Sequence, residues 1–222
     1  LESNASSTEI QVNEELALLI DSFRSADMTR ADIEANKEYK MLGEQDKAIL
    51  WVKLAEIYFE QHQYSKVTNS LDPLEEYQRI SFDAQFMHAF SLSKISKKDL
   101  SIEQYQLLIK HNPNAQAATF NLALLLKQKK RYEDAVPVFI KAIEISSGNK
   151  KAKAYSGLAG SYYKLGNFKL ASENYRKSLE YRPGAANIWV QLARSIAADN
   201  GVYADVMDAF DKGIALNPDD FK

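Results

Sequence analysis

Residues 157–166, GLAGSYYKLG, combine three glycines with a lysine, as do the loops that cradle phosphate groups. A phosphate-binding loop needs a preceding strand, glycines with positive φ, and a lysine followed by Ser or Thr where a helix begins. The sequence around Gly157, Gly160 and Lys164 provides none of these features. We therefore expect no nucleotide site in this segment.

The other reactive residues are too scattered to predict a catalytic or metal site. The sequence contains no cysteine, which excludes disulfides, thiolate ligands and cysteine nucleophiles. Of its histidines, His62, His88 and His111, we expect His88 to be a partly buried, hydrogen-bonded structural residue. Paired carboxylates, a nucleophile elbow and a nucleotide fingerprint are also missing from the sequence. We expect no enzyme activity, no cofactor and no metal.

The composition is typical of a folded protein without a strong electrostatic field. Lys and Arg number 28 against 30 Asp and Glu, and the net charge of −2 favours neither nucleic acid nor an anionic membrane as a partner. The sequence has no apolar run of about 18 residues, so membrane insertion is not expected. The first residue is Leu1, which indicates a chain cut from a longer protein. Localisation stays open between the cytoplasm and, if a signal or anchor precedes Leu1, an extracytoplasmic compartment such as the periplasm.

A single frame of bulky residues, alanine and leucine recurs along the chain. The frame has a bulky or polar residue, then Leu or His three positions on, Ala next, and a large residue three positions later. Its five copies begin at Trp51, Gln85, Thr119, Tyr155 and Trp189, at intervals of 34, 34, 36 and 34 residues. A second pattern of a small or β-branched residue and a large residue four positions on follows each copy, from Val67, Ser101, Ala135, Ala171 and Val206. Three copies then end in proline, at Pro113, Pro183 and Pro218.

Helical spacing places the residues of each frame on one face, and its alanine lets two helix backbones approach closely. Each helix pair is too small to bury its own apolar face and must stack on its neighbours. Together these residues resemble the tetratricopeptide repeat over roughly residues 48–219. The resemblance implies an all-α, right-handed superhelical solenoid of antiparallel helix pairs. Its five repeats in residues 48–222 would start near 48, 82, 116, 152 and 186.

Residues 13–47 predict an N-terminal helix pair that caps the array or forms a degenerate repeat. Asn13 is the expected N-cap of a helix over 14–24, and Thr29 opens a capping box for another helix over 30–42 that Gly43 stops. Residues 1–12 are expected to be disordered or left over from cloning.

Two further features depart from a regular array. Pro73 should shorten or kink the second helix of the first repeat, before an irregular or helical piece in DPLEEYQRI. The two additional residues of the fourth repeat fall in the polar stretch 146–151, where we expect a longer connection.

The resemblance implies that a peptide or partner helix binds in a concave groove lined by the first helices. Their faces away from the core pattern provide the candidate contacts Val52, Phe59, Phe86, Met87, Phe90, Phe120, Asn121, Leu124, Gly157, Gly160, Tyr163, Lys164 and Arg194. Tetratricopeptide proteins that grip acidic chaperone tails carry Lys, Asn and Arg at set groove positions. Only Asn121 and Lys153 match here, so such a clamp is not expected.

Two interpretations of the apolar groove remain. Phe86, Phe90 and Phe120 are covered by neighbouring first helices or by the helix over 14–24, or they anchor a partner segment. In the second case Gly157 and Gly160 leave a gap that a partner can enter. The expected function is a protein-interaction scaffold, and the alternative is a regulatory or substrate-presenting arm of a larger enzyme such as a transferase.

The last helix predicts an uncovered end. Val206, Phe210 and Ile214 form one apolar stripe, and the opposite side near Met207 and Ala209 would face a further element. We therefore expect either more helical sequence beyond Lys222 or a weak homodimer through the C-terminal end.

Overall fold

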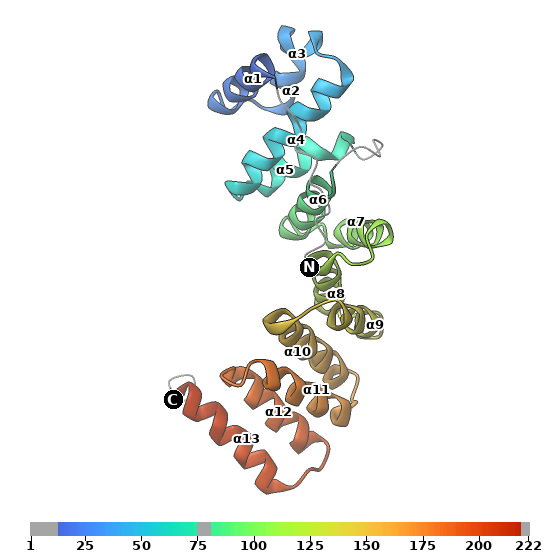
Figure 1. Cartoon of the computed structure of the whole chain (residues 1–222), viewed down its shortest axis with the longest axis vertical. Coiled ribbons are helices and arrows are strands. Elements are labelled where there is room, and N and C mark those ends of the chain that lie inside the picture. The colour runs from blue at the N-terminus through green and yellow to red at the C-terminus, as the bar shows by residue number, and fades with distance from the viewer. Residues whose placement is uncertain (1–12, 75–80, 219–222) are drawn as a thin grey trace. The chain divides into compact units, whose positions relative to one another are not determined.

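The structure is a computed structural model that describes residues 13–74 and 81–218 (Figure 1). Within these residues the fold is all-α: thirteen α-helices, one short 3-10 helix and no strand. Successive helices pack in antiparallel pairs, as the repeated frame predicts. Contacts divide the chain into two compact units, Leu1–Leu108 and Ile109–Lys222, and the boundary falls in the last turn of α7.

The first unit holds the N-terminal helices and the first two repeats. Its elements are α1 (Glu14–Ser25), α2 (Arg30–Ala35), α3 (Lys37–Met41), α4 (Glu44–Glu60), α5 (Tyr64–Leu71), the 3-10 helix η1 (Asp72–Leu74), α6 (Phe82–Lys94) and α7 (Lys98–His111). The shortened α5 followed by η1 is the outcome expected from Pro73. Residues 75–80, the rest of the DPLEEYQRI stretch, lie outside the described residues.

The second unit holds three helix pairs. They are α8 (Gln116–Gln128) with α9 (Tyr132–Glu144), α10 (Gly148–Lys164) with α11 (Phe168–Tyr181), and α12 (Ala186–Ala198) with α13 (Tyr203–Leu216). Helices α7, α11 and α13 each end two residues before a proline, because a proline disfavours helical backbone in the residue that precedes it. Gly166 has a φ of +78° in the turn after α10, a conformation that glycine adopts without steric cost.

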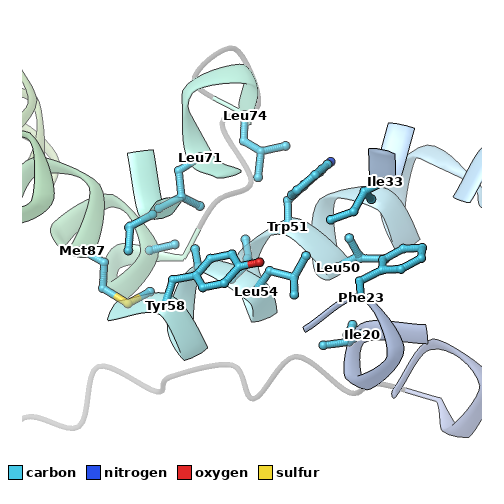
Figure 2. Packing of buried hydrophobic residues seen from close by; sticks show 14 of the residues in the cluster. Ile20, Phe23, Ile33, Leu50, Trp51, Leu54, Tyr58, Leu71, Leu74 and Met87 are labelled. Atoms are coloured by element: carbon cyan, nitrogen blue, oxygen red, sulfur yellow. The ribbon is translucent and has the colours of Figure 1, made fainter. Parts of the chain in front are cut away.

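The core of the first unit is built on α4. Figure 2 shows Leu50, Trp51, Leu54 and Tyr58 along this helix, with α1 on one side and Met87 of α6 near Tyr58. The frame alanines of all five repeats are fully buried, which allows each first helix to lie close to its partner. In the second repeat the small residue of the second pattern is Ser101, and its hydroxyl donates to the Ala89 carbonyl, 2.6 Å away.

The N-terminal segment differs from its prediction in two respects. Asn13 caps α1 and Thr29 forms the capping box, but the helix expected over 30–42 breaks at Asn36. The Asn36 side chain accepts hydrogen bonds from the backbone of Glu38 and Tyr39, which starts a new helix. Gly43 is the N-cap of α4, at a φ of −66°, whereas the preceding helix already ends at Met41 with Leu42 as its C-cap.

The additional residues of the fourth repeat also lie where they were not expected. They extend α10 at its N-terminus, from Gly148 onward, and do not lengthen a connection. Helix α10 consequently has 17 residues, against 13 in each of α8 and α12.

Candidate functional site

The predicted contact residues fall into three classes of exposure. Four are buried, namely Val52, Met87, Gly157 and Gly160. Seven are partly buried, namely Phe59, Phe86, Phe90, Phe120, Asn121, Leu124 and Tyr163. Two are exposed, namely Lys164 and Arg194.

Val52 and Met87 belong to the core of the first unit and do not present a side chain to a partner. Val52 is only 3% exposed, and both residues lie in the buried cluster that Figure 2 displays in part. The reason is that α6 packs against α4 as well as against α5. This contact covers positions that a single helix pattern places outside the core.

In the first unit, four rings on α4, α5 and α6 form what we call the aromatic surface: Phe59, Tyr64, Phe86 and Phe90. The Phe90 ring lies edge-on to Phe59 at 5.5 Å and to Tyr64 at 5.9 Å, and it stacks with Phe86 at 6.2 Å. The Lys94 ammonium lies 4.9 Å from the Phe90 ring centre. The rings therefore cover one another in part and stay partly exposed. This exposure is intermediate between the two sequence-based interpretations, in which the rings are either covered by neighbouring helices or anchor a partner segment.

In the second unit, side chains of the protein itself fill the space beside the two helical glycines. A Cβ at Gly157 would lie 2.3 Å from the fully buried Phe139 ring, which also packs edge-on against Phe120. A Cβ at Gly160 would lie 2.7 Å from the Lys127 Nζ. The gap expected at these glycines for a partner is thus occupied by Phe139 and Lys127, and that expectation was wrong.

Two polar groups that the sequence analysis did not single out meet above Gly160. The same Cβ position lies 3.5 Å from the Tyr175 hydroxyl, so Lys127 and Tyr175 converge on one point. Burial, and secondarily the Lys164 charge, lowers the pKa of Lys127. Burial raises the pKa of Tyr175 to about 12, helped by Tyr163. The sequence did contain one signal for this lysine, because Lys127 is the one charged residue of α8.

His88 has the structural role that its position predicts. Its ring is buried, and Nε2 lies 2.7 Å from Asp72 Oδ1 at the end of α5. Among the described residues, no group of three or more His, Cys, Asp or Glu side chains could hold a metal ion. Over the same residues, no helix combines the length and the apolar character needed to cross a membrane.

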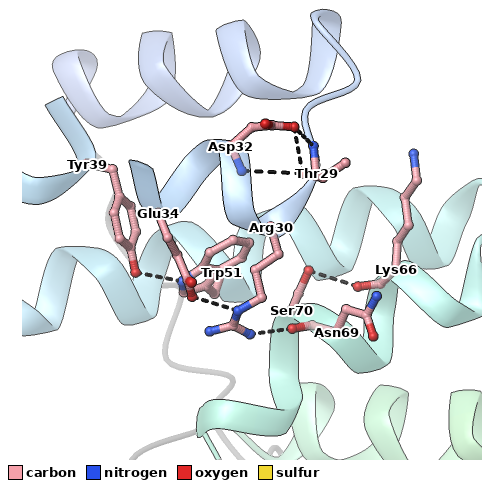
Figure 3. A network of polar contacts seen from close by, with 9 residues as sticks. All are labelled: Thr29, Arg30, Asp32, Glu34, Tyr39, Trp51, Lys66, Asn69 and Ser70. Atoms are coloured by element: carbon pink, nitrogen blue, oxygen red, sulfur yellow. Dashed lines mark hydrogen bonds and ion pairs between the residues drawn. The ribbon is translucent and has the colours of Figure 1, made fainter. Parts of the chain in front are cut away.

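A polar network attaches the N-terminal helices to the first repeat (Figure 3). The Arg30 guanidinium of α2 lies 4.8 Å from the Trp51 ring centre, and its Nε donates to Glu34 at 2.6 Å. Its Nη1 donates to the Asn69 carbonyl of α5. Trp51 Nε1 in turn donates to the Tyr39 hydroxyl at 3.0 Å, so α2, α3, α4 and α5 share one network.

These features define an all-α repeat protein whose partly exposed first-helix faces are its candidate binding surfaces. Family models of the tetratricopeptide repeat match residues 115–183 and 157–221. Residues 115–221 therefore consist of tetratricopeptide repeats, and repeats of this kind commonly serve as protein-interaction scaffolds.

One curated relative and several solved structures are similar to this chain. The Hsp70-Hsp90 organising protein of Plasmodium falciparum (isolate 3D7) is 33% identical over 107 residues, which are 46% of this chain. The match spans only 19% of that relative, about a fifth of its length. A MamA structure from Desulfovibrio magneticus RS-1 has a TM-score of 0.70 at 16% identity, covering 80% of this chain and 98% of that one. A second MamA crystal structure has a TM-score of 0.71 at 13% identity, over 78% and 93% of the two chains. At 16% and 13% identity, the likeness to the two MamA structures concerns the fold alone.

Proposed function

We propose that this protein holds a segment of a partner protein, a peptide or a helix, on the aromatic surface of its first unit. The observation that carries the proposal is the partial exposure of Phe59, Phe86 and Phe90, which lie together on the first helices of two successive repeats. Partly exposed aromatic rings in one patch are typical anchors of protein interfaces. Two or three such anchors, less the cost of ordering the partner, suit a dissociation constant of about 1 µM.

The similarity to the Hsp70-Hsp90 organising protein does not extend the proposal to chaperone tails. That relative is named for organising two chaperones, and this chain matches a fifth of it. Of the residues that would form a tail clamp, only Asn121 and Lys153 have the required type, and Val52 is buried where a polar side chain would be needed. An apolar or amphipathic partner segment suits the aromatic surface better.

The experiment compares two double variants of the full chain. Phe86→Ala with Phe90→Ala removes two rings of the aromatic surface, and Leu100→Ala with Leu107→Ala removes two exposed leucines of α7. Partners captured by the unchanged protein are identified by mass spectrometry, and the affinity of one of them is then measured for each variant. We expect the aromatic variant to bind at least about tenfold more weakly and the leucine variant to bind normally. Circular dichroism checks that both variants stay helical, and equal binding by all three proteins would remove the proposal.

The role we infer is binding and not catalysis, because tetratricopeptide repeats commonly act as non-catalytic scaffolds. A regulatory or substrate-presenting arm of a larger enzyme is the alternative. It would use the same surfaces, and no contact in the described residues favours it over a scaffold.

We also infer a weak self-association through α13. This helix carries exposed apolar side chains, including Tyr203 at 77% and Leu216 at 47% exposure, with Met207 and Ile214 between them. A second copy of the chain could cover them in a two-fold symmetric contact. Sedimentation velocity over a concentration series should show a reversible dimer that Met207→Lys with Ile214→Lys abolishes. A monomer at every concentration would contradict this inference.

A further inference from the structure

The first helices of the second unit carry charges of one sign. Helices α8, α10 and α12 contain no Asp or Glu. They contain six cationic residues, namely Lys127, Lys150, Lys151, Lys153, Lys164 and Arg194. The partner helices α9, α11 and α13 all include acidic residues, so the asymmetry belongs to the first helices.

These cations are not neutralised within the described part of the chain. None of the six takes part in an ion pair there, whereas Arg131, Lys141 and Lys212 elsewhere in the unit do. Lys153 and Lys164 are eleven positions apart on α10, on the same side of the helix as Gly160. Helix α8, which carries Lys127, packs against α10.

Lys127 is one of the two partly buried members of this set, with Lys151, and it has no hydrogen-bond or ion-pair partner among the described residues. Its Nζ lies over the bare backbone of Gly160, in the space that any side chain at residue 160 would fill. The Tyr175 hydroxyl, which points to the same place, has no hydrogen-bond partner among the described residues. Tyr175 is only 5% exposed, and its hydroxyl keeps slight contact with solvent, because Ser91 Oγ is the one fully enclosed side-chain polar atom without a partner in the described part. Two hydrogen-bond donors and a positive charge thus face one point beside Gly160.

We propose that the first helices of the second unit bind an acidic segment of a partner protein, with one carboxylate accepting hydrogen bonds from Lys127 Nζ and Tyr175 Oη above Gly160. Lys164 and Lys153 then meet further acidic residues of the segment along α10. The two carboxylate oxygens match the two donors, and the charge of the ligand compensates an ammonium that burial has deprived of water. Of these residues only Lys153 also belongs to the pair that matches a chaperone-tail clamp, Asn121 and Lys153. The site does not depend on the aromatic surface of the first unit.

A carboxylate suits this site better than a phosphate or a nucleic acid. Phosphate groups in proteins are commonly held by the two-pronged guanidinium of arginine, and the group above Gly160 has no arginine. Nucleic-acid surfaces combine a basic field with rings available for stacking. Here the net charge of the whole chain is −2, and the nearby Tyr163 ring packs against Phe168 at 5.2 Å.

The test measures binding of defined probes to the full chain by fluorescence anisotropy. The first probe is a labelled acetyl-Ser-Glu-Leu-Glu-Asp-Leu-Glu-amide, and the second replaces each Glu and Asp by Gln and Asn. A labelled ten-residue oligothymidine is the third. We expect only the first probe to bind, with a shift of the Gly160 amide signal in nuclear magnetic resonance spectra.

Three variants separate this site from general charge attraction. Lys127→Gln with Lys164→Gln should weaken binding of the acidic peptide by about tenfold or more. The control, Lys169→Gln with Arg176→Gln, removes two exposed cations of α11 and should change binding by less than about threefold. Gly160→Ala leaves every charge in place but displaces the Lys127 ammonium, so it should weaken binding as well.

Several results would overturn the proposal. They are the absence of acidic-peptide binding, equal losses for the Lys127/Lys164 and the Lys169/Arg176 double variants, and unchanged binding by Gly160→Ala. Oligothymidine binding as tight as that of the peptide would assign the cationic helices to nucleic acid instead. Each variant is checked for its helical content, and the removal of a partly buried, unpaired lysine is not expected to prevent folding.

Discussion

A glycine inside a helix costs up to about 1 kcal/mol relative to alanine, so Gly157 and Gly160 need a physical reason. The sequence shows that they lie in a first helix but not what faces them, and the expectation of a gap for a partner was wrong. Gly157 is required by a neighbouring helix, because the Phe139 ring fills the space of its missing Cβ. Gly160 leaves room for the movable end of Lys127. The same residue type, three positions apart, therefore serves packing in one case and a candidate site in the other.

The two glycines should respond oppositely to the same substitution. Gly157→Ala places a methyl group against the buried Phe139 ring and should lower the free energy of unfolding by about 1 to 3 kcal/mol. Gly160→Ala only displaces a flexible lysine end and should leave stability unchanged or raise it by up to about 1 kcal/mol. Urea denaturation followed by circular dichroism gives both values. Equal effects of the two substitutions would contradict the packing described here.

The pKa of Tyr175 predicts a loss of stability at alkaline pH. Folding raises this pKa from 10.0 to about 12, so the unfolded chain releases the proton first as the pH rises. The stabilisation is fully present below pH 10 and is lost between pH 10 and pH 12. Compared with Tyr175→Phe, the unchanged protein should lose about 1 kcal/mol of unfolding free energy between pH 9 and pH 11, and about 2 to 3 kcal/mol in full. If the unfolding free energies of the two proteins changed in parallel with pH, the result would contradict a buried, neutral tyrosine at position 175.

At the scale of elements, local signals predicted helix ends better than helix faces. Asn13, the Thr29 capping box and the prolines that follow the second helices act on their own neighbours, so they could be interpreted from the sequence. The break at Asn36 also has a local cause, since asparagine side chains readily start a new helix. The capping box at Thr29 and the stop expected at Gly43 suggested one continuous helix instead. Val52 and Met87 were misplaced for a different reason. Their burial depends on contacts between α4 and α6 that no single-helix pattern contains.

The attachment of α2 to the first repeat should depend on Arg30. This side chain joins α2 to Trp51 of α4 and to the Asn69 carbonyl of α5 (Figure 3). We expect Arg30→Ala to lower the unfolding free energy of the full chain by about 1 to 2 kcal/mol. Arg24→Ala is the control, because Arg24 pairs, among the residues that the structure describes, only with Asp21 on its own helix. This substitution should change stability by less than about 0.5 kcal/mol. A similar effect of both substitutions would show that the network does not hold α2 in place.

At the scale of the whole molecule, the sequence predicted the repeat number and the helix pairing but not the chemical division between the two units. Repeats can be recognised because every copy buries the same alanine and leucine positions. The positions outside that pattern vary freely, and their exposure depends on the neighbouring helices. As a result the first unit presents partly exposed rings, while the first helices of the second unit carry cations without acidic residues. A scaffold with two such surfaces can recognise two features of its partners, one apolar and one acidic.

The most direct test of the proposed function is site-specific photo-crosslinking of the full chain in its source extract. The photoreactive residue p-benzoylphenylalanine replaces Phe90 in one protein and the exposed Leu107 of α7 in the other, both in the first unit. If the aromatic surface holds a partner segment, irradiation should attach a discrete partner protein from position 90 and none above background from position 107. Equal crosslinking from both positions, or crosslinking from position 107 alone, would contradict the assignment of this surface as the binding site.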